Sequence, residues 1–200
     1  MTTYAFFDFD GTLTWKDSFF RFLVETVGWP RLARGGLRQL PWVLGYGAGL
    51  ASPHTAKEAI FTEFFQGWPA GRLLAAGREF ARDVLPGMVR PAGRRRLAWH
   101  RDQGHVVAVV SATFEFYLEP WCREQGIHLL GTAVEMTDGV VTGRFAGANC
   151  IGPEKVRRIR ERFPLRAGDH IHAYGDSRGD REMLALATEA HFRPFRRPRA

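Results

Sequence analysis

Lysine and cysteine are both scarce in this 200-residue chain. Of its 28 basic residues, only Lys16, Lys57 and Lys155 are lysines. The two cysteines, Cys122 and Cys150, are far apart and form no close-spaced pattern typical of a metal site. They do not suggest a disulfide framework, so we expect the chain to work in the reducing cytoplasm.

The chain also lacks a long uninterrupted apolar run. The early run at 4–7 stops at Asp8, with no basic region or cleavage site beside it, so we expect no signal peptide. The segment Gln39–Ala56 carries no formal charge, but Pro41, Pro53 and three glycines interrupt it. These interruptions exclude a transmembrane helix there.

Positive charge is in excess, with a net charge of +7. Such an excess suits nucleic acid, an anionic membrane, a phosphorylated substrate, or only a solvated surface. Arg94–Arg96 and the C-terminal "RPFRRPRA" are the densest clusters, but no nucleic-acid-binding signature with interleaved aromatics accompanies them. We therefore expect no nucleic-acid partner. A nucleic-acid or membrane-binding module remains the alternative function from another class.

Strand and helix patterns alternate through most of the chain. Tyr4–Asp8, the run "HVVAVVS" that ends at Ser111, and "HIHAY" at 170–174 predict three buried strands. "EAHFRPF" at 189–195 predicts an edge strand, and Asp138-Gly139 predicts the turn of a hairpin. This alternation predicts an α/β fold with a Rossmann-like parallel sheet and helices on both faces.

Between the first strand and residue 86 the patterns are helical only. Helices are expected from Asp17 or Ser18 to Val27, over Arg31–Tyr46, from Ser52 to Phe65, and over Ala70–Leu85. We therefore predict an α/β core of residues 1–14 and 86–200, with a helical cap of residues 15–85 inserted after the first strand.

The cap also contains Arg31, Arg34 and Arg38 at helical spacing, beside an uncharged apolar segment. Two interpretations stay open. The segment is an interfacial helix that makes peripheral contact with an anionic membrane, or it is a cap helix that packs on its neighbours.

Polar side chains follow three of the predicted strands. Asp8, Ser111 and Asp176 each come where a core strand stops, and ligands of such sheets bind outside the carboxyl ends of the strands. Asp10 adds a second carboxylate next to Asp8. Because two buried like charges repel each other and lose hydration, we expect a bound cation to compensate them.

Four segments carry a resemblance to a known family. Asp8–Thr14 ("DFDGTLT"), Ser111, Lys155 in "GPEK" and Tyr174–Asp180 ("YGDSRGD") resemble, in this order, the four signatures of the haloacid dehalogenase superfamily of phosphohydrolases. The position of the helical insertion is similar to that in the phosphoserine phosphatase-like branch, subfamily IB. The resemblance covers Tyr4–Phe192, nearly the whole chain.

This resemblance implies a phosphatase, a Mg²⁺-dependent phosphomonoester hydrolase that acts through an aspartyl-phosphate. It implies that Asp8 is the nucleophile and that Asp10 protonates the leaving group and then activates water. Ser111 would donate a hydrogen bond to the phosphoryl group, and Lys155 would neutralise its charge. Gly11 would let the chain turn close to the phosphate.

The resemblance also implies the metal ligands. Mg²⁺ would be held by Asp8, by the backbone carbonyl of Asp10 and by Asp176, with Asp180 as a supporting residue outside the ligand set. Thr12 and Ala112 would contact the substrate. His170 and His172 point the same way on one strand, and we interpret this pair as structural rather than as zinc ligands.

Substrate choice is expected from the cap. Asp17 stands where phosphoserine phosphatases carry a glutamate that binds the substrate ammonium group, so it either recognises substrate or only caps a helix. Ala112 and Thr113 replace two glycines of that branch. We expect a small phosphorylated metabolite, such as phosphoserine or a related phosphomonoester. Because the apolar cap is similar to that of phosphatidylglycerophosphatases in this branch, a lipid phosphate is the alternative substrate.

Overall fold

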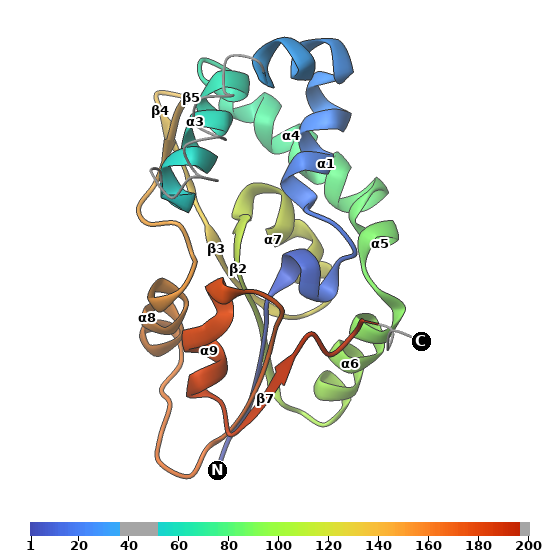
Figure 1. Ribbon diagram of the computed structural model, residues 1–200, viewed down its shortest axis with the longest axis vertical. Coiled ribbons are helices and arrows are strands. Elements are labelled where there is room, and N and C mark those ends of the chain that lie inside the picture. The colour runs from blue at the N-terminus through green and yellow to red at the C-terminus, as the bar shows by residue number, and fades with distance from the viewer. Residues whose placement is uncertain (37–51, 197–200) are drawn as a thin grey trace.

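The structure is a computed structural model that describes residues 1–36 and 52–196 (Figure 1). A five-stranded parallel sheet of order β3-β2-β1-β6-β7 forms its centre. The strands are β1 (Thr3–Phe7), β2 (Val106–Phe114), β3 (His128–Thr132), β6 (His170–Gly175) and β7 (Glu189–Phe192). The α/β class with a parallel sheet is thereby confirmed, and β7 lies at its edge as predicted.

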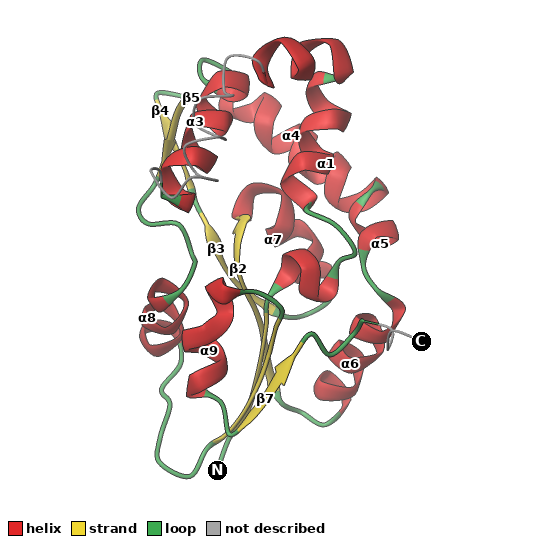
Figure 2. Ribbon diagram, in the orientation of Figure 1, coloured by secondary structure: helices red, strands yellow, loops and turns green. Residues whose placement is uncertain are grey.

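Helices cover both faces of this sheet (Figure 2). One layer holds α6 (Pro91–Asp102) and α7 (Glu115–Glu124), and the other holds α8 (Pro153–Arg162) and α9 (Arg181–Leu186). The side chains of β1 point alternately to the two faces of the sheet, and both faces are apolar and need a layer of helices to cover them. Ala5 and Phe7 pack into the first layer, whereas Tyr4 and Phe6 pack into the second. A strand buried on both faces has the continuous apolar sequence seen here.

The remaining helices stand beyond the carboxyl ends of the strands (Figure 1). They are α1 (Ser18–Val27), α3 (Pro53–Phe65), α4 (Ala70–Asp83) and the short α5 (Leu85–Met88). Residues 29–36 are also helical. The rest of the helix predicted over Arg31–Tyr46, and the apolar segment as far as residue 51, lie outside the described residues. None of the helices within 1–36 and 52–196 has the length and apolar character needed to cross a bilayer.

A β-hairpin joins these helices from the second half of the chain. Strands β4 (Val134–Thr137) and β5 (Val140–Phe145) flank Asp138 and Gly139, whose φ angles of 49° and 75° form the predicted two-residue turn. The amide of Val141 donates to the carbonyl of Trp68 at 2.9 Å, so the hairpin pairs with the segment that follows α3.

The division of the chain into an α/β core of residues 1–14 and 86–200 and a cap of residues 15–85 stays a prediction.

Strand β2 is longer than predicted, and this corrects the position of Ser111. The strand continues to Phe114, and α7 begins only at Glu115. Pairing with β1 ends at Val109, but a register shift lets Phe114 pair with Thr132 of β3. Phe114 is fully buried among aromatic rings, and that burial favours the extended backbone. Ser111 therefore lies inside the strand, just beyond its pairing with β1.

Candidate active site

Three buried carboxylates meet at the carboxyl edge of the sheet. Asp8, Asp176 and Asp180 each offer an oxygen within 4.8 Å of the others, and they are only 7%, 8% and 1% exposed. Asp8 follows β1, and its amide donates to the carbonyl of Tyr174 on β6 at 2.8 Å. Because β1 and β6 are paired in parallel, the residues that follow them lie side by side.

Lys155 lies between two of these carboxylates. Its Nζ is 2.7 Å from Oδ1 of Asp8 and 2.6 Å from Oδ1 of Asp180. Burial alone would lower the pKa of Lys155, but the two carboxylates outweigh it and hold the pKa above its usual value. Burial raises the pKa of Asp8 to about 6, against the opposing effect of the Lys155 ammonium. A charged lysine therefore fixes one oxygen of Asp8.

Asp180 organises the loop that carries Asp176. Its Oδ2 accepts hydrogen bonds from the amide of Asp176 at 3.1 Å, and from the amide and hydroxyl of Ser177 at 3.0 and 2.9 Å. Burial would raise the pKa of Asp180, but the charge and hydrogen bond of Lys155 bring it below its usual value. Because both of its oxygens are bound by protein donors, Asp180 supports this loop and the lysine.

The turn after Asp8 passes very close to Asp176. Gly11 has a φ of +84°, and a Cβ placed there would lie 2.7 Å from Oδ2 of Asp176. Both the backbone conformation and the space therefore require glycine. The Thr12 hydroxyl donates to Oδ1 of Asp176 at 3.3 Å.

Asp10 points away from Lys155, toward α1 and β2. Its Oδ1 accepts from the amide of Ser18 at 2.8 Å, and its Oδ2 accepts from the hydroxyls of Ser18 at 3.0 Å and Thr113 at 2.7 Å. Burial, helped by the charge of Asp17, raises the pKa of Asp10 to about 7, although these hydrogen bonds oppose the rise. Such a carboxyl group can both give and take a proton near neutral pH.

Some of these residues border a cavity of about 460 Å³ between the sheet and helices α1 and α3, whose lining does not include Gly11, Thr12 or Asp176. The predicted residues that line it are Asp8, Asp10, Asp17, Ser111, Ala112, Lys155 and Asp180. The Ser111 hydroxyl donates to Oγ1 of Thr113 at 3.0 Å. Asp17 accepts from the amide of Phe20 at 2.7 Å, so it caps α1 while it also borders the cavity.

Sequence reasoning missed Lys57 in the same cavity. This α3 lysine donates a hydrogen bond to the carbonyl of Ala112, and its Nζ lies 4.2 Å from the centre of the Phe114 ring. Burial lowers the pKa of Lys57 to about 8, so it is still charged at neutral pH. The scarcity of lysine singles out this residue in the sequence, but no motif shows that α3 brings it over β2.

The C-terminal segment also reaches the site. Nη2 of Arg196 lies 2.5 Å from Oδ2 of Asp176, and Nε of Arg193 donates to the Asp176 carbonyl at 3.1 Å. Arg193 and Arg196, at the start of the Arg-rich tail, therefore bring positive charge next to Asp176.

The donor set fits a Mg²⁺ ion. The three buried carboxylates face Lys155 and the Arg196 guanidinium, which leaves one negative charge uncompensated, and carboxylate and carbonyl oxygens are the ligands that Mg²⁺ prefers. The Arg196 guanidinium shows that this position beside Asp176 accepts a cation. Asp8, Asp176 and the carbonyl of Asp10 are the residues that suit it.

Comparisons with known proteins bear on the family and the fold of the chain. A family model described as haloacid dehalogenase-like hydrolase matches residues 5–185. Protein CicA of Caulobacter vibrioides is 37% identical over 195 residues, which cover 95% of this chain and 85% of that protein. Phosphoserine phosphatase SerB1 of Mycobacterium tuberculosis is 30% identical over 131 residues, 64% of this chain and 42% of that protein. A solved structure of a protein with unknown function from Bordetella pertussis Tohama I has a TM-score of 0.78 at 29% identity, and covers 94% of this chain and 88% of that one.

Proposed function

The chain belongs to the haloacid dehalogenase-like hydrolases, and on this basis we propose that it is a Mg²⁺-dependent phosphomonoesterase with Asp8 as its nucleophile. One observation carries the proposal. Asp8 is a buried carboxylate at the edge of a cavity, and one of its oxygens is held at 2.7 Å by a charged lysine. This arrangement orients a carboxylate for attack on an anionic group that the lysine also attracts.

In the first step, a carboxylate oxygen of Asp8 attacks the phosphorus of the substrate. Lys155 holds Oδ1, so we assign Oδ2 as the attacking atom. The bond from Asp8 to phosphorus forms while the bond from phosphorus to the leaving alkoxide breaks, which gives an aspartyl-phosphate. Lys155 and the Ser111 hydroxyl stabilise the negative charge of the transferred group.

Asp10 moves the protons of both steps. Its protonated form gives a proton to the leaving alkoxide, and its carboxylate then takes a proton from the water that attacks the aspartyl-phosphate. Phosphate leaves, and Asp8 returns to its carboxylate form. The raised pKa of Asp10, about 7, keeps both forms populated near neutral pH.

Mg²⁺, held by Asp8, Asp176 and the Asp10 carbonyl, would neutralise phosphoryl charge when bound. The contribution of the chain is to keep these oxygens together through Asp180, which fixes the loop of Asp176. Thr12 and Gly11 set the distance between the turn that follows Asp8 and the loop that carries Asp176.

The test is hydrolysis of a generic aryl phosphate with and without Mg²⁺. We expect Asp8→Asn to lower kcat on the order of 1000-fold or more, because the nucleophile is lost. The matched control is Asp138→Asn, in the hairpin turn, where asparagine tolerates the positive φ equally well. Full activity of Asp8→Asn, or an equal loss of activity in Asp138→Asn, would show that Asp8 is not the nucleophile.

For the substrate, we infer a small phosphomonoester that carries both an ammonium and a carboxylate group. Two opposite charges support this inference, because Asp17 and Lys57 both line the cavity beyond the catalytic residues. Phosphoserine has this pattern, and one relative is named a phosphoserine phosphatase. The lipid alternative depends on a segment outside the described residues, so membrane contact stays a prediction, as does the cytoplasmic location.

Three phosphate esters separate the two contacts. Phosphoethanolamine lacks the carboxylate of phosphoserine, and 3-phosphoglycerate lacks its ammonium group. Lys57→Met should lower kcat/KM about 10-fold or more for phosphoserine and 3-phosphoglycerate, which carry a carboxylate, and should spare phosphoethanolamine. Asp17→Asn should lower kcat/KM more for phosphoserine and phosphoethanolamine than for 3-phosphoglycerate, since asparagine still caps α1 while the effect on the pKa of Asp10 is common to all three esters. Unchanged ratios among the three esters in both variants would exclude this substrate class.

A further inference from the structure

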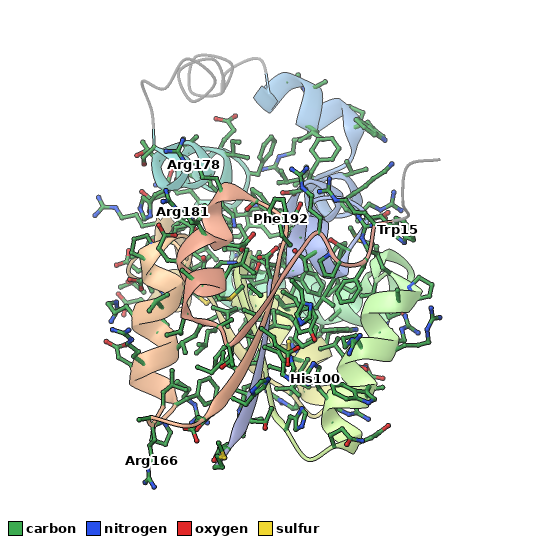
Figure 3. All side chains as sticks on the ribbon, turned by 60° about the horizontal axis from the view of Figure 1, so that its bottom comes forward. Trp15, His100, Arg166, Arg178, Arg181 and Phe192 are labelled. Atoms are coloured by element: carbon green, nitrogen blue, oxygen red, sulfur yellow. The ribbon has the colours of Figure 1, made fainter. Side chains whose placement is uncertain are left out.

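The face of the sheet beneath α6 gathers five histidines. They are His100, His105, His170, His172 and His191. Figure 3 labels His100 of α6 and Phe192 at the end of β7, two elements that contribute histidines to this group. None of the five lines the catalytic cavity.

Two paired strands place four possible metal ligands on one face. Because side chains alternate along a strand, His170 and His172 of β6 share a face, and so do Glu189 and His191 of β7. The register pairs His172 directly with Glu189. The group is therefore built on neighbouring backbone strands, which fix its ligands more firmly than a loop would.

The carboxylate of Glu189 is the centre of this group. Its Oε1 is 2.9 Å from Nε2 of His170, and its Oε2 is 3.4 Å from Nδ1 of His172 and 3.8 Å from Nε2 of His191. His170, His172 and Glu189 each offer a donor atom within 4.8 Å of the others. Donors at about 2.1 Å from a tetrahedral ion lie roughly 3.4 Å apart, so donor atoms that lie within 4.8 Å of one another must draw closer together to bind one.

Two of these imidazole nitrogens are buried without a hydrogen bond. Within the described residues, Nδ1 of His172 and Nε2 of His191 have no hydrogen-bond partner, and the His172 side chain is only 10% exposed. Buried polar atoms are rarely left in this state, and one without a partner needs an explanation such as an ion. Both nitrogens face the same oxygen of Glu189.

The histidines nearer to α6 are already satisfied. Nδ1 of His100 lies 2.8 Å from Nδ1 of His105, and its Nε2 lies 2.9 Å from the hydroxyl of Tyr174. Although His100, His105 and His172 also come close together, the first two have partners in the protein. The imidazole nitrogens without a hydrogen-bond partner therefore belong to His172 of β6 and His191 of β7.

We propose that His170, His172 and Glu189 bind a divalent cation of the zinc type, with the His191 imidazole beside them. Two imidazoles and a carboxylate suit Zn²⁺ and its transition-metal neighbours, whereas Mg²⁺ prefers oxygen ligands alone. This site differs from the catalytic one in its residues and in its metal. It is an alternative to the structural interpretation of His170 and His172, which stays a prediction, and it arises because the sequence did not show that Glu189 and His191 lie beside them.

Zinc titration of the purified full chain tests the proposal. Calorimetry at pH 7.5 in excess Mg²⁺, which fills the oxygen site, should show one Zn²⁺ per chain. The double variant His170→Ala/Glu189→Gln should bind Zn²⁺ on the order of 100-fold more weakly or worse, because it removes two ligands. The matched control is His128→Ala, a histidine of β3 at the opposite edge of the sheet, and it should bind like the unaltered chain.

A spectroscopic readout separates this site from nonspecific binding. Co²⁺ in place of Zn²⁺ should give the visible absorption of a four-coordinate ion, and Glu189→Gln alone should weaken it while circular dichroism shows an intact fold. Equal zinc affinity of the unaltered chain and the double variant would overturn the proposal. So would the loss of zinc binding in Asp176→Asn with the double variant unaffected, since the zinc would then lie in the catalytic site.

Discussion

Replacement of Lys155 by methionine should destabilise the fold in a pH-dependent way. The substitution keeps the length of the side chain but removes the charge that contacts Asp8 and Asp180 at 2.7 and 2.6 Å. Loss of one partner of a buried ion pair costs about 3–5 kcal/mol, because the other charge stays buried. With a urea m-value of about 3 kcal/mol/M, the unfolding midpoint at pH 7.5 should fall by roughly 1–1.7 M.

The loss of stability caused by Lys155→Met should be smaller at low pH. Without the lysine, burial holds the pKa of Asp8 well above its unfolded value of about 3.9. A carboxyl group whose folded pKa is raised stabilises the fold at low pH, and this contribution is lost as pH rises through the folded pKa. From pH 7.5 to 5.0, the uptake of one proton can stabilise the variant by at most about 3 kcal/mol. The unaltered chain, with a pKa of about 6 for Asp8, gains about 1 kcal/mol over the same range, so the difference in stability narrows by up to about 2 kcal/mol.

Urea unfolding followed by circular dichroism, in EDTA at pH 5.0 and 7.5, measures this effect. The matched control is Lys57→Met, which also removes a lysine of the cavity, but one that is half-buried and contacts a backbone carbonyl. Because Lys57, with a pKa of about 8, is mostly charged at both pH values, its removal should change the free energy of unfolding by nearly the same amount at each. If Lys155→Met lowers the free energy of unfolding as much at pH 5.0 as at pH 7.5, the claim that Lys155 compensates the charges of Asp8 and Asp180 is wrong.

Two further substitutions test the catalytic groups. Thr113→Val removes the 2.7 Å hydrogen bond that opposes the rise in the pKa of Asp10. The pKa of the acid should therefore rise, and the alkaline limb of the pH profile of kcat should move to higher pH; a limb that moves to lower pH contradicts this. Gly11→Ala would place a Cβ 2.7 Å from Asp176 and should lower Mg²⁺-dependent kcat on the order of 100-fold. Gly67→Ala, with a φ of +79° but open space, should cost about 1–2 kcal/mol of stability and leave kcat unchanged.

Much of the fold follows from patterns along the chain. The apolar run of β1, the β-branched run of β2 and the alternation of strand and helix predict a parallel sheet, and the sheet then predicts where ligands bind. For this reason Asp8 and Asp176, which are 168 positions apart, could be expected at one edge from the sequence alone. The turn at Asp138 and Gly139 followed from local backbone preferences alone.

Other features depend on contacts between distant segments. Strand β2 passes Ser111 because Phe114 is buried against the rings of Phe19 and Phe61, which come from helices beyond the sheet. Lys57 faces the cavity only through the packing of α3 over β2. The histidine group needs the register of β6 with β7, and single residues of an edge strand carry no signal of their register.

The most direct test of the account is to identify the residue that carries phosphate during turnover. The enzyme is mixed with substrate and Mg²⁺, quenched in acid within the first turnover, digested, and examined by mass spectrometry. We predict phosphate on Asp8, and none on this peptide region in Asp8→Asn. Turnover with the phosphate on another residue, or with an unmodified Asp8 at every time point, would contradict the claim that Asp8 attacks the phosphorus.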